Sequence, residues 1–184
     1  MLYVGCDESN HGKTPEIYVA SFSRNDNYVI PSKITIPKKK KDKRILEVIN
    51  NLASKRDVWY AYCMLTDEIK DYCESRNIPL LPTMITNLLK GEDFIGDDFS
   101  GSAKLYMDGN VREETKKDIA EKCEILFNTH LEIICNQKLD QCIPLVNFSD
   151  TIARYIYRKY NESKNKYKII EALTRNKHYK EIIF

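Results

Sequence analysis

Five acidic residues stand at positions of this sequence where carboxylates can do chemistry. Asp7 and Glu8 directly follow a short apolar run near the start of the chain, and Asp108 follows a later one. Asp140 and Asp150 come after a third apolar run. Clustered carboxylates repel one another unless a cation neutralises them, and hard divalent cations prefer such oxygen ligands. The acids are therefore candidate metal ligands, although strands also end in acids simply because they end at the surface.

The elements that would carry these acids follow a definite order along the chain. Segments 2–4, 17–22 and 28–36 are strand-like and joined by short polar links, which predicts an antiparallel meander. Later strands alternate with helices, which is typical of parallel strands joined by crossovers. These strands are expected at 58–64, 103–107 and 131–135. The helices are expected at 42–53, 67–74, 79–90, 112–127 and from 144 onward. The predicted fold class is α/β: a mixed sheet with three antiparallel strands followed by parallel strands, flanked by helices.

A central first strand would bring the acids together. The carboxyl ends of neighbouring parallel strands lie at one edge of a sheet, so Asp7 and Glu8 would adjoin Asp108. Asp140, which follows the last strand, would add a fourth carboxylate. Two divalent cations held there can activate a water and stabilise the leaving oxygen of a phosphodiester. The acid placement therefore predicts a nuclease that uses two Mg²⁺ or Mn²⁺ ions.

The length of the chain indicates one domain, and its net charge does not indicate a particular partner. The chain has 184 residues and a formal net charge of +2, which is enough for one core and says little about partners. Basic residues gather locally at 38–44, and tyrosines alternate with basic residues over 154–167. Both segments are expected either to contact nucleic acid or to be ordinary solvated surface. The expected organisation is a catalytic domain over 1–160 and a basic helical tail over 161–184.

The cysteines favour a reducing compartment. There are six of them, without a CxxC pair, and several lie in apolar runs where buried thiols are common. Neither a signal peptide nor an apolar run long enough to span a membrane is evident. We therefore expect a cytoplasmic protein that does not bind a membrane. The partner expected from the acid placement is nucleic acid.

The sequence resembles the type 2 ribonucleases H. That family opens with a strand ending in Asp-Glu-x-Gly-Arg-Gly, and residues 7–12 read DESNHG. Its second signature, a strand ending in Asp-Gly, matches LYMDGN at 105–110. Its third, Lys-x-Asp followed by a proline and a helix, matches residues 138–140 and Pro144. Residues 66–69, followed by two helices, resemble the middle region of the family. The order and spacing of these matches are more specific than each match alone.

The resemblance implies a ribonuclease H-like fold and hydrolysis of the RNA strand of an RNA–DNA hybrid, leaving a 3′-hydroxyl. It also implies the metal ligands, which would be Asp7, Glu8, Asp108 and Asp140. Other ribonuclease H-like groups place the fourth acid on the last helix, in a pattern that Asp150 matches. The alternative for Asp150 is a surface ion pair with Arg154, four residues on. Both acids remain candidates for the fourth position.

The turn after the first strand is the expected substrate-binding segment. In the family its Gly-Arg-Gly senses the ribose 2′-hydroxyl, whereas this chain has Asn10 and His11 before Gly12. His11 is a candidate for protonating a leaving group, or else a turn residue. The candidate substrate-binding residues are Ser9, Asn10, His11, Gly12 and Arg154. Because the turn differs, a ribonuclease H-like nuclease for other DNA or RNA, or an inactive nucleic-acid-binding or interaction module, is the alternative.

Overall fold

A six-stranded mixed sheet forms the centre of the computed structural model. The strands are β1 (Leu2–Ser9), β2 (Glu16–Ser23), β3 (Trp59–Leu65), β4 (Gly101–Asp108), β5 (Thr129–Asn136) and β6 (Tyr179–Glu181). Their order across the sheet is β5-β4-β1-β2-β3-β6. The residues that the structure describes are 1–9, 12, 15–31, 45, 47, 49, 51, 58–89, 101–163 and 179–181.

Strand direction changes at β1. β1 is antiparallel to β2, and β2 is antiparallel to β3, while β4 and β5 continue parallel to β1 on its other side. β6 adds a short parallel partner to β3. The predicted α/β class, with three antiparallel strands and further parallel ones, is confirmed. β1 is central, as its residue pattern predicted.

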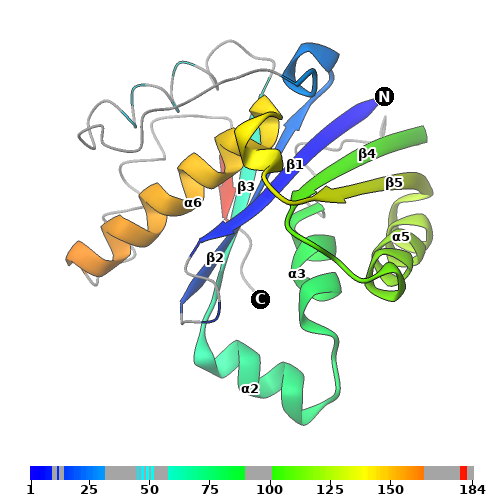
Figure 1. Ribbon diagram of the computed structural model, residues 1–184. Coiled ribbons are helices and arrows are strands. Elements are labelled where there is room, and N and C mark those ends of the chain that lie inside the picture. Colours follow the sequence, from blue (N-terminus) through cyan, green and yellow to red (C-terminus); the bar gives the residue numbers. More distant parts are fainter. Residues whose placement is uncertain are drawn as a thin grey trace.

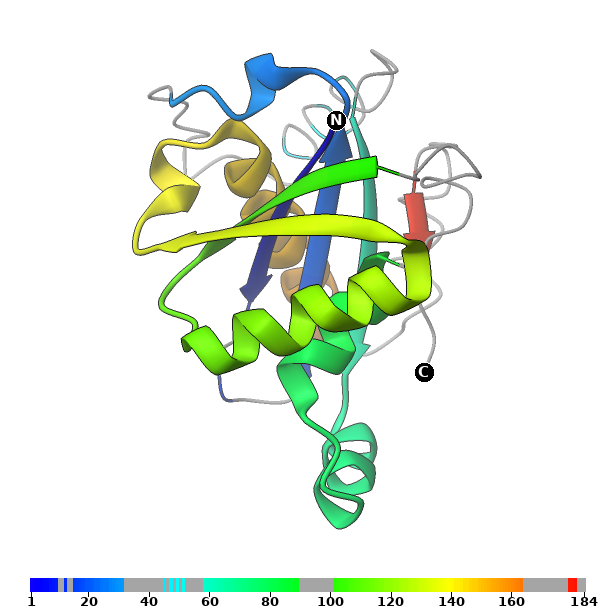
Figure 2. The same cartoon turned by 90° about the vertical axis from the view of Figure 1, so that its right-hand side faces the viewer.

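Helices cover both faces of the sheet. They are α2 (Asp67–Ser75), α3 (Leu80–Leu89), α5 (Glu113–Phe127) and α6 (Pro144–Ser163), with 3-10 turns η1 (Asp26–Tyr28) and η3 (Leu139–Gln141). α6 lies on one face over β1 and β2, and α3 and α5 lie on the opposite face (Figures 1 and 2). The start of α2 follows the predicted rule, because the Thr66 hydroxyl accepts the Ile69 amide at 3.4 Å.

The third antiparallel strand differs from the prediction. It is β3, which was expected to be a parallel strand, and not the segment 28–36. After β2, the Asn25 Oδ1 accepts a hydrogen bond from the Asn27 amide at 3.0 Å, and this cap begins η1 where the prediction had a strand. Residues 32–36 lie outside the described part of the chain. A long connection between β2 and β3 leaves strand direction open, so local pattern could not decide it.

Alternation along the strands divides the core into two clusters. Val4, Cys6 and Leu105 belong to the cluster under α3 and α5, whereas the cluster under α6 contains Val19 and Tyr60. The described positions of the predicted helix 42–53, which are 45, 47, 49 and 51, are helical. Ile45 and Ile49 among them are buried in the α6 cluster. Each face of the sheet is thus closed by its own apolar layer.

The end of the chain combines two described pieces. α6 runs to Ser163, and Tyr179–Glu181 forms β6 beside β3. The predicted helix in the tail, and the tyrosine and lysines between these pieces, lie outside the described residues. In the part of the chain that is described, no helix has both the length and the apolar character to cross a membrane.

Candidate active site

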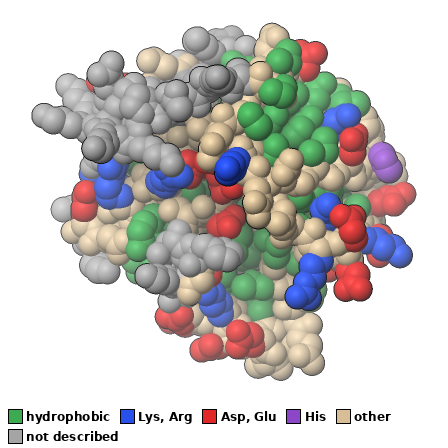
Figure 3. All heavy atoms as spheres, in the orientation of Figure 1, with side chains coloured by type: hydrophobic (Ala, Val, Ile, Leu, Met, Phe, Trp, Pro, Cys, Tyr) green, Lys and Arg blue, Asp and Glu red, His purple; other side chains and the backbone are tan. Residues whose placement is uncertain are grey.

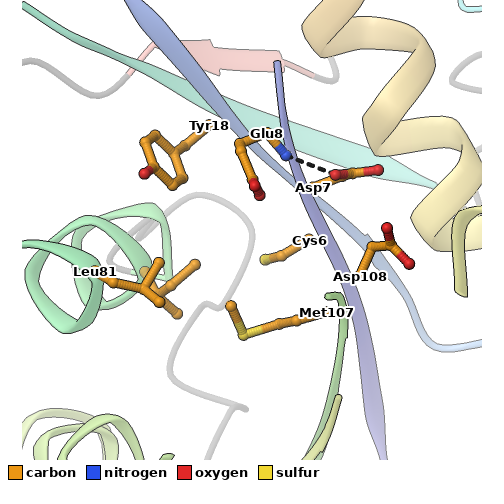
Figure 4. Close-up of a pocket in the computed structure, with 8 residues that line it drawn as sticks. Cys6, Asp7, Glu8, Tyr18, Leu81, Met107 and Asp108 are labelled. Atoms are coloured by element: carbon orange, nitrogen blue, oxygen red, sulfur yellow. Dashed lines mark hydrogen bonds between the residues drawn. The ribbon is translucent and has the colours of Figure 1, made fainter. Parts of the chain in front are cut away.

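Asp7 and Asp108 lie side by side at the carboxyl ends of two parallel strands. β1 and β4 are in register through Cys6 and Met107, so the next residue of each strand is an aspartate. Alternation places both aspartates on the sheet face that α6 covers. Figure 4 shows the two carboxylates on the same side of β1, toward the helix. The juxtaposition predicted from the strand ends is present.

Glu8 points to the other face of the sheet. Its neighbour across the strands is Tyr18, and both line a small pocket that Asp7 and Asp108 also border (Figure 4). The pocket has room for about one water molecule. The expected convergence of four side chains is therefore incomplete, because adjacent strand residues face opposite ways. Glu8 still lies close enough to raise the pKa of Asp7.

A close approach between β1 and α6 places the helix over Asp7. A Cβ atom on Gly5 would come within 2.5 Å of the Leu145 carbonyl carbon, so only glycine leaves room for the helix. The buried Ser149 Oγ lies 2.7 Å from the Gly5 carbonyl oxygen and 2.7 Å from the Ser21 Oγ. These contacts join the first turns of α6 to two central strands, and they determine which α6 residues face the site.

Asp150, one residue further along α6, is the helix acid that reaches this site. It is buried, with 7% of its surface exposed, and it is among the charges that raise the pKa of Asp7. Its Oδ1 accepts the Arg154 Nε at 2.6 Å, and the Arg154 side chain is about half exposed. The predicted pair four residues apart is present. Its acid lies in the interior, so it is not an ordinary surface pair.

The pKa of Asp7 is strongly perturbed. Burial first, then the charges of Asp150, Glu8 and Asp108, raise its pKa to about 9. The Glu8 amide donates to the Asp7 Oδ1 at 2.8 Å, which lowers the pKa only in part. A carboxyl group in such surroundings is neutral at physiological pH unless a cation approaches it. Perturbation of this size is typical of functional sites.

Asp140 lies in η3, which packs beside Asp108. The Leu139 amide donates to the Asp108 Oδ1 at 2.6 Å, so the turn is tied to the end of β4. The Asn147 side-chain amide donates to the Asp140 carbonyl oxygen at 2.8 Å and joins the same turn to α6. The turn that carries Asp140 and the helix that carries Asp150 therefore meet at the Asp108 edge of the site.

The predicted substrate-binding turn is described at its two ends. Ser9 is nearly buried at the end of β1 and pairs with Ile17. Gly12 is exposed and has a φ of +73°, a conformation that side chains rarely adopt. Asn10 and His11 lie outside the described residues, as does the basic segment 38–44.

Comparison with solved structures identifies the architecture. A chain of the PCNA:RNase HII complex from Archaeoglobus fulgidus matches with a TM-score of 0.58 and 14% identity, over 91% of this chain and 77% of that one. A mutant of Bst-RNase HIII matches with a TM-score of 0.58 and 16% identity, over 94% and 60%. Ribonuclease H2 from Pyrococcus horikoshii OT3 matches with a TM-score of 0.51 and 18% identity, over 91% and 77%. The fold is that of the type 2 ribonucleases H. No model of a known protein family matches the sequence, and no curated protein matches it.

Within this type 2 ribonuclease H fold, the acidic side chains at the site are of the chemical type that binds a hard divalent cation. Asp7, Asp108 and Asp150 offer only carboxylate oxygens, and a cation that approached the buried Asp7 would favour its charged form. In the described residues, however, no three His, Cys, Asp or Glu side chains form a group that could hold a metal ion. Asp108 is engaged by the Leu139 amide and Asp150 by Arg154. A cation would therefore require these side chains to turn toward Asp7.

Several residues that build the candidate site could not be found from the sequence. Gly5 and Ser149 determine how α6 lies on β1, yet nothing in their local pattern marks them. Glu16, Tyr18 and Lys70 form a polar cluster that also contacts the amide of Gly12, in the predicted substrate-binding turn. The signal that the sequence offered was an acid, Glu16, directly before the apolar run 17–20; Glu16 proves to be the first residue of β2 and is buried with it.

Proposed function

We propose that this protein is a metal-dependent endonuclease that hydrolyses the RNA strand of RNA–DNA hybrids, with Mg²⁺ or Mn²⁺. One observation carries the proposal: the buried Asp7, whose pKa is raised to about 9 by burial and by three neighbouring acids. Burying such a cluster of acids costs stability, and clusters of this kind are typical of functional sites. Its position at the carboxyl ends of β1 and β4 supports a site for ligand chemistry.

The proposed metal ligands are Asp7 and Asp108, with either Asp150 or Asp140. Glu8 is proposed to complete the set, and its side chain would have to turn from the opposite face of the sheet toward Asp7. Two bound divalent cations would generate the attacking hydroxide and neutralise the leaving oxygen. The protein's part is to hold its carboxylates at one edge of a rigid sheet, so that little reorganisation accompanies reaction. The α6 and η3 contacts described above support that rigidity.

Arg154 is proposed to contact substrate. In the structure it neutralises Asp150 from the exposed side of the site. If Asp150 turns toward a cation, the guanidinium is left at the rim, where a phosphate oxygen can accept its hydrogen bonds. Ser9, Asn10, His11 and Gly12 are proposed to contact the nucleic-acid backbone, with His11 protonating the leaving group.

The hybrid substrate rests on the likeness of motifs and fold to ribonucleases H. The charges of the coloured surface in Figure 3 are interspersed in sign, which favours recognition through a local site over broad electrostatic attraction. Asn10 and His11 replace the glycine and arginine of the family turn. A nuclease for other nucleic acid is therefore the second candidate function, and an inactive nucleic-acid-binding or interaction module is the third.

Cleavage assays separate these functions. Labelled RNA–DNA hybrid, duplex DNA and single-stranded RNA are incubated with wild type and Asp7→Asn in Mg²⁺ or Mn²⁺. We expect hybrid cleavage by wild type, and a loss of at least about 10²-fold in kcat for the variant, because charge stabilisation at the site is lost. Equal activity of the variant would remove the proposed mechanism. Preference for another substrate would establish the second function, and binding without cleavage would establish the third.

Metal-induced stabilisation separates Asp150 from Asp140. Mn²⁺ that binds only the folded state raises Tm in proportion to RT ln(1 + [L]/Kd). We expect Asp150→Asn to reduce this rise, as Asp7→Asn does, because Asp150 is the acid whose charge acts on Asp7. Differential scanning fluorimetry with increasing Mn²⁺ measures it. A reduced rise in Asp140→Asn with a normal one in Asp150→Asn would assign the ligand to Asp140.

A further inference from the structure

A buried polar cluster lies directly behind the substrate turn. Glu16, with 5% of its surface exposed, is the first residue of β2. Its Oε1 accepts the Lys70 Nζ at 2.8 Å and the Gly12 amide at 3.2 Å. Its Oε2 accepts the Tyr18 hydroxyl at 2.8 Å. One carboxylate thus joins the turn, β2 and α2.

The Glu16 cluster (Gly12, Glu16, Tyr18 and Lys70) adjoins the acidic site through Glu8. Tyr18 lies opposite Glu8 in the β1–β2 register, on the sheet face that carries the pocket. Burial first, and the Glu16 hydrogen bond and charge next, raise the pKa of Tyr18, so its hydroxyl remains a donor. Any movement of the turn at Gly12 is therefore resisted by groups anchored beside the site.

The chemistry of the cluster favours a role beyond stability. An ion pair taken out of water gives little net stabilisation, because desolvation offsets the Coulomb attraction. Only about a fifth of the Lys70 side chain and 7% of the Glu16 side chain are exposed. What the arrangement supplies is a defined position for Gly12, an exposed residue with a positive φ.

We infer that Glu16 is a positioning residue, which holds the backbone amide of Gly12 in the place where it meets the nucleic-acid backbone, with Lys70 as the counter-charge of Glu16. The inference rests on the proposed function, because the turn has a ligand only if the site binds nucleic acid. Backbone at Gly12 that is already held in place loses less conformational freedom when substrate binds. Removing the anchor therefore weakens binding and leaves the chemical step nearly unchanged.

Kinetics with matched variants test the inference. Glu16→Gln removes the negative charge of the cluster. Lys70→Met removes the positive charge that pairs with Glu16, and Lys70→Arg keeps a positive charge at that position. We expect the first two variants to raise KM for the hybrid about tenfold, the effect of losing one charge-assisted hydrogen bond, with kcat within about twofold of wild type. Lys70→Arg should return KM toward the wild-type value. The control is Glu132→Gln, which breaks the surface pair with Lys104 at 2.8 Å and should change neither constant.

Hydrogen exchange at the Gly12 amide gives a readout that needs no substrate. We expect it to exchange faster in Glu16→Gln and Lys70→Met than in wild type, because its acceptor is weakened or released. Unchanged exchange, or a lower Tm with an unchanged KM, overturns the inference and leaves the proposed function standing. A wild type that neither binds nor cleaves nucleic acid overturns both. Lys70→Met keeps the test decisive if Glu16→Gln fails to fold, because Lys70 lies nearer the surface.

Discussion

At the scale of single residues, Asp7 is the acid on which the proposed function rests. Its carboxyl group is held in the interior with three other acids around it, and its pKa is raised to about 9. An unfolded chain gives the same group an ordinary value of 3.8. The folded state therefore holds a proton on Asp7 between these values, and the unfolded state does not. By linkage, the contribution of Asp7 to stability is complete below about pH 4 and is lost as pH rises toward 9.

We predict that Asp7→Asn makes the metal-free protein more stable at about pH 8, and that this advantage disappears near pH 4. The asparagine is neutral at every pH, so it avoids the cost of a buried charge. The gain should reach at least about 1 kcal/mol, since one unit of pKa shift corresponds to about 1.4 kcal/mol. Urea unfolding at several pH values measures it. Asp71→Asn, an exposed change on α2, is the control and should show no such pH dependence.

At the scale of elements, the contact of α6 with β1 assembles the site. Helix and strand approach most closely where Gly5 meets the backbone of Leu145 and Val146. Ser149 closes the same contact from the helix. The next residue, Asp150, is placed beside Asp7 as a consequence. Local stability at this contact and the composition of the acidic cluster are therefore coupled.

We predict that Gly5→Ala destabilises the protein by about 3 kcal/mol, at the upper end of overpacking effects, because the added Cβ meets backbone that cannot rotate away. It should also weaken Mn²⁺-induced stabilisation by moving α6 from β1. Denaturant unfolding with and without Mn²⁺ measures both effects. Gly101→Ala is the matched control, since nothing lies within 4 Å of a Cβ there. Equal stability of the two variants would show that α6 does not rest on Gly5 as described.

At the scale of the whole molecule, the sheet separates two apolar cores, and most of the cysteines are buried. All six cysteines are free, and the four most buried ones, Cys6, Cys63, Cys73 and Cys123, lie within the protein. The expectation of buried thiols is confirmed for these four. Burial raises the pKa of Cys123 to about 12, and burial with the nearby Asp7 charge raises that of Cys6. Cys135 and Cys142 are half-buried.

We predict that a thiol reagent at about pH 8 modifies native protein first at Cys142. Thiolates are the reactive species, and burial keeps Cys6 and Cys123 protonated and out of contact with the reagent. Cys135 should react more slowly than Cys142, because burial raises its pKa. Mass spectrometry of labelled peptides measures the order, and all six should react in guanidinium chloride. Early labelling of Cys6 would show that the core under α3 and α5 opens readily.

Much of the architecture could be predicted from local pattern. Strand periodicity placed β2, β4 and β5 near their observed bounds, and Thr66 correctly predicted the start of α2. β1 begins as predicted but runs on to Ser9, well beyond the apolar segment 2–4. These features depend on hydrogen bonding and burial within a few residues of one another, which sequence records directly. The acids at the ends of β1 and β4 followed for the same reason, since register in a parallel pair brings the strand ends together.

Only the tertiary structure decided how these pieces meet. It made β3 antiparallel, turned Glu8 to the face opposite Asp7, and set the buried Asp150 beside Asp7 with Arg154 as its counter-charge. Each of these outcomes depends on contacts between residues far apart in the chain. A pattern of side chains records which residues are apolar or acidic, and it does not record the direction of a long connection or the space that one glycine leaves for a helix.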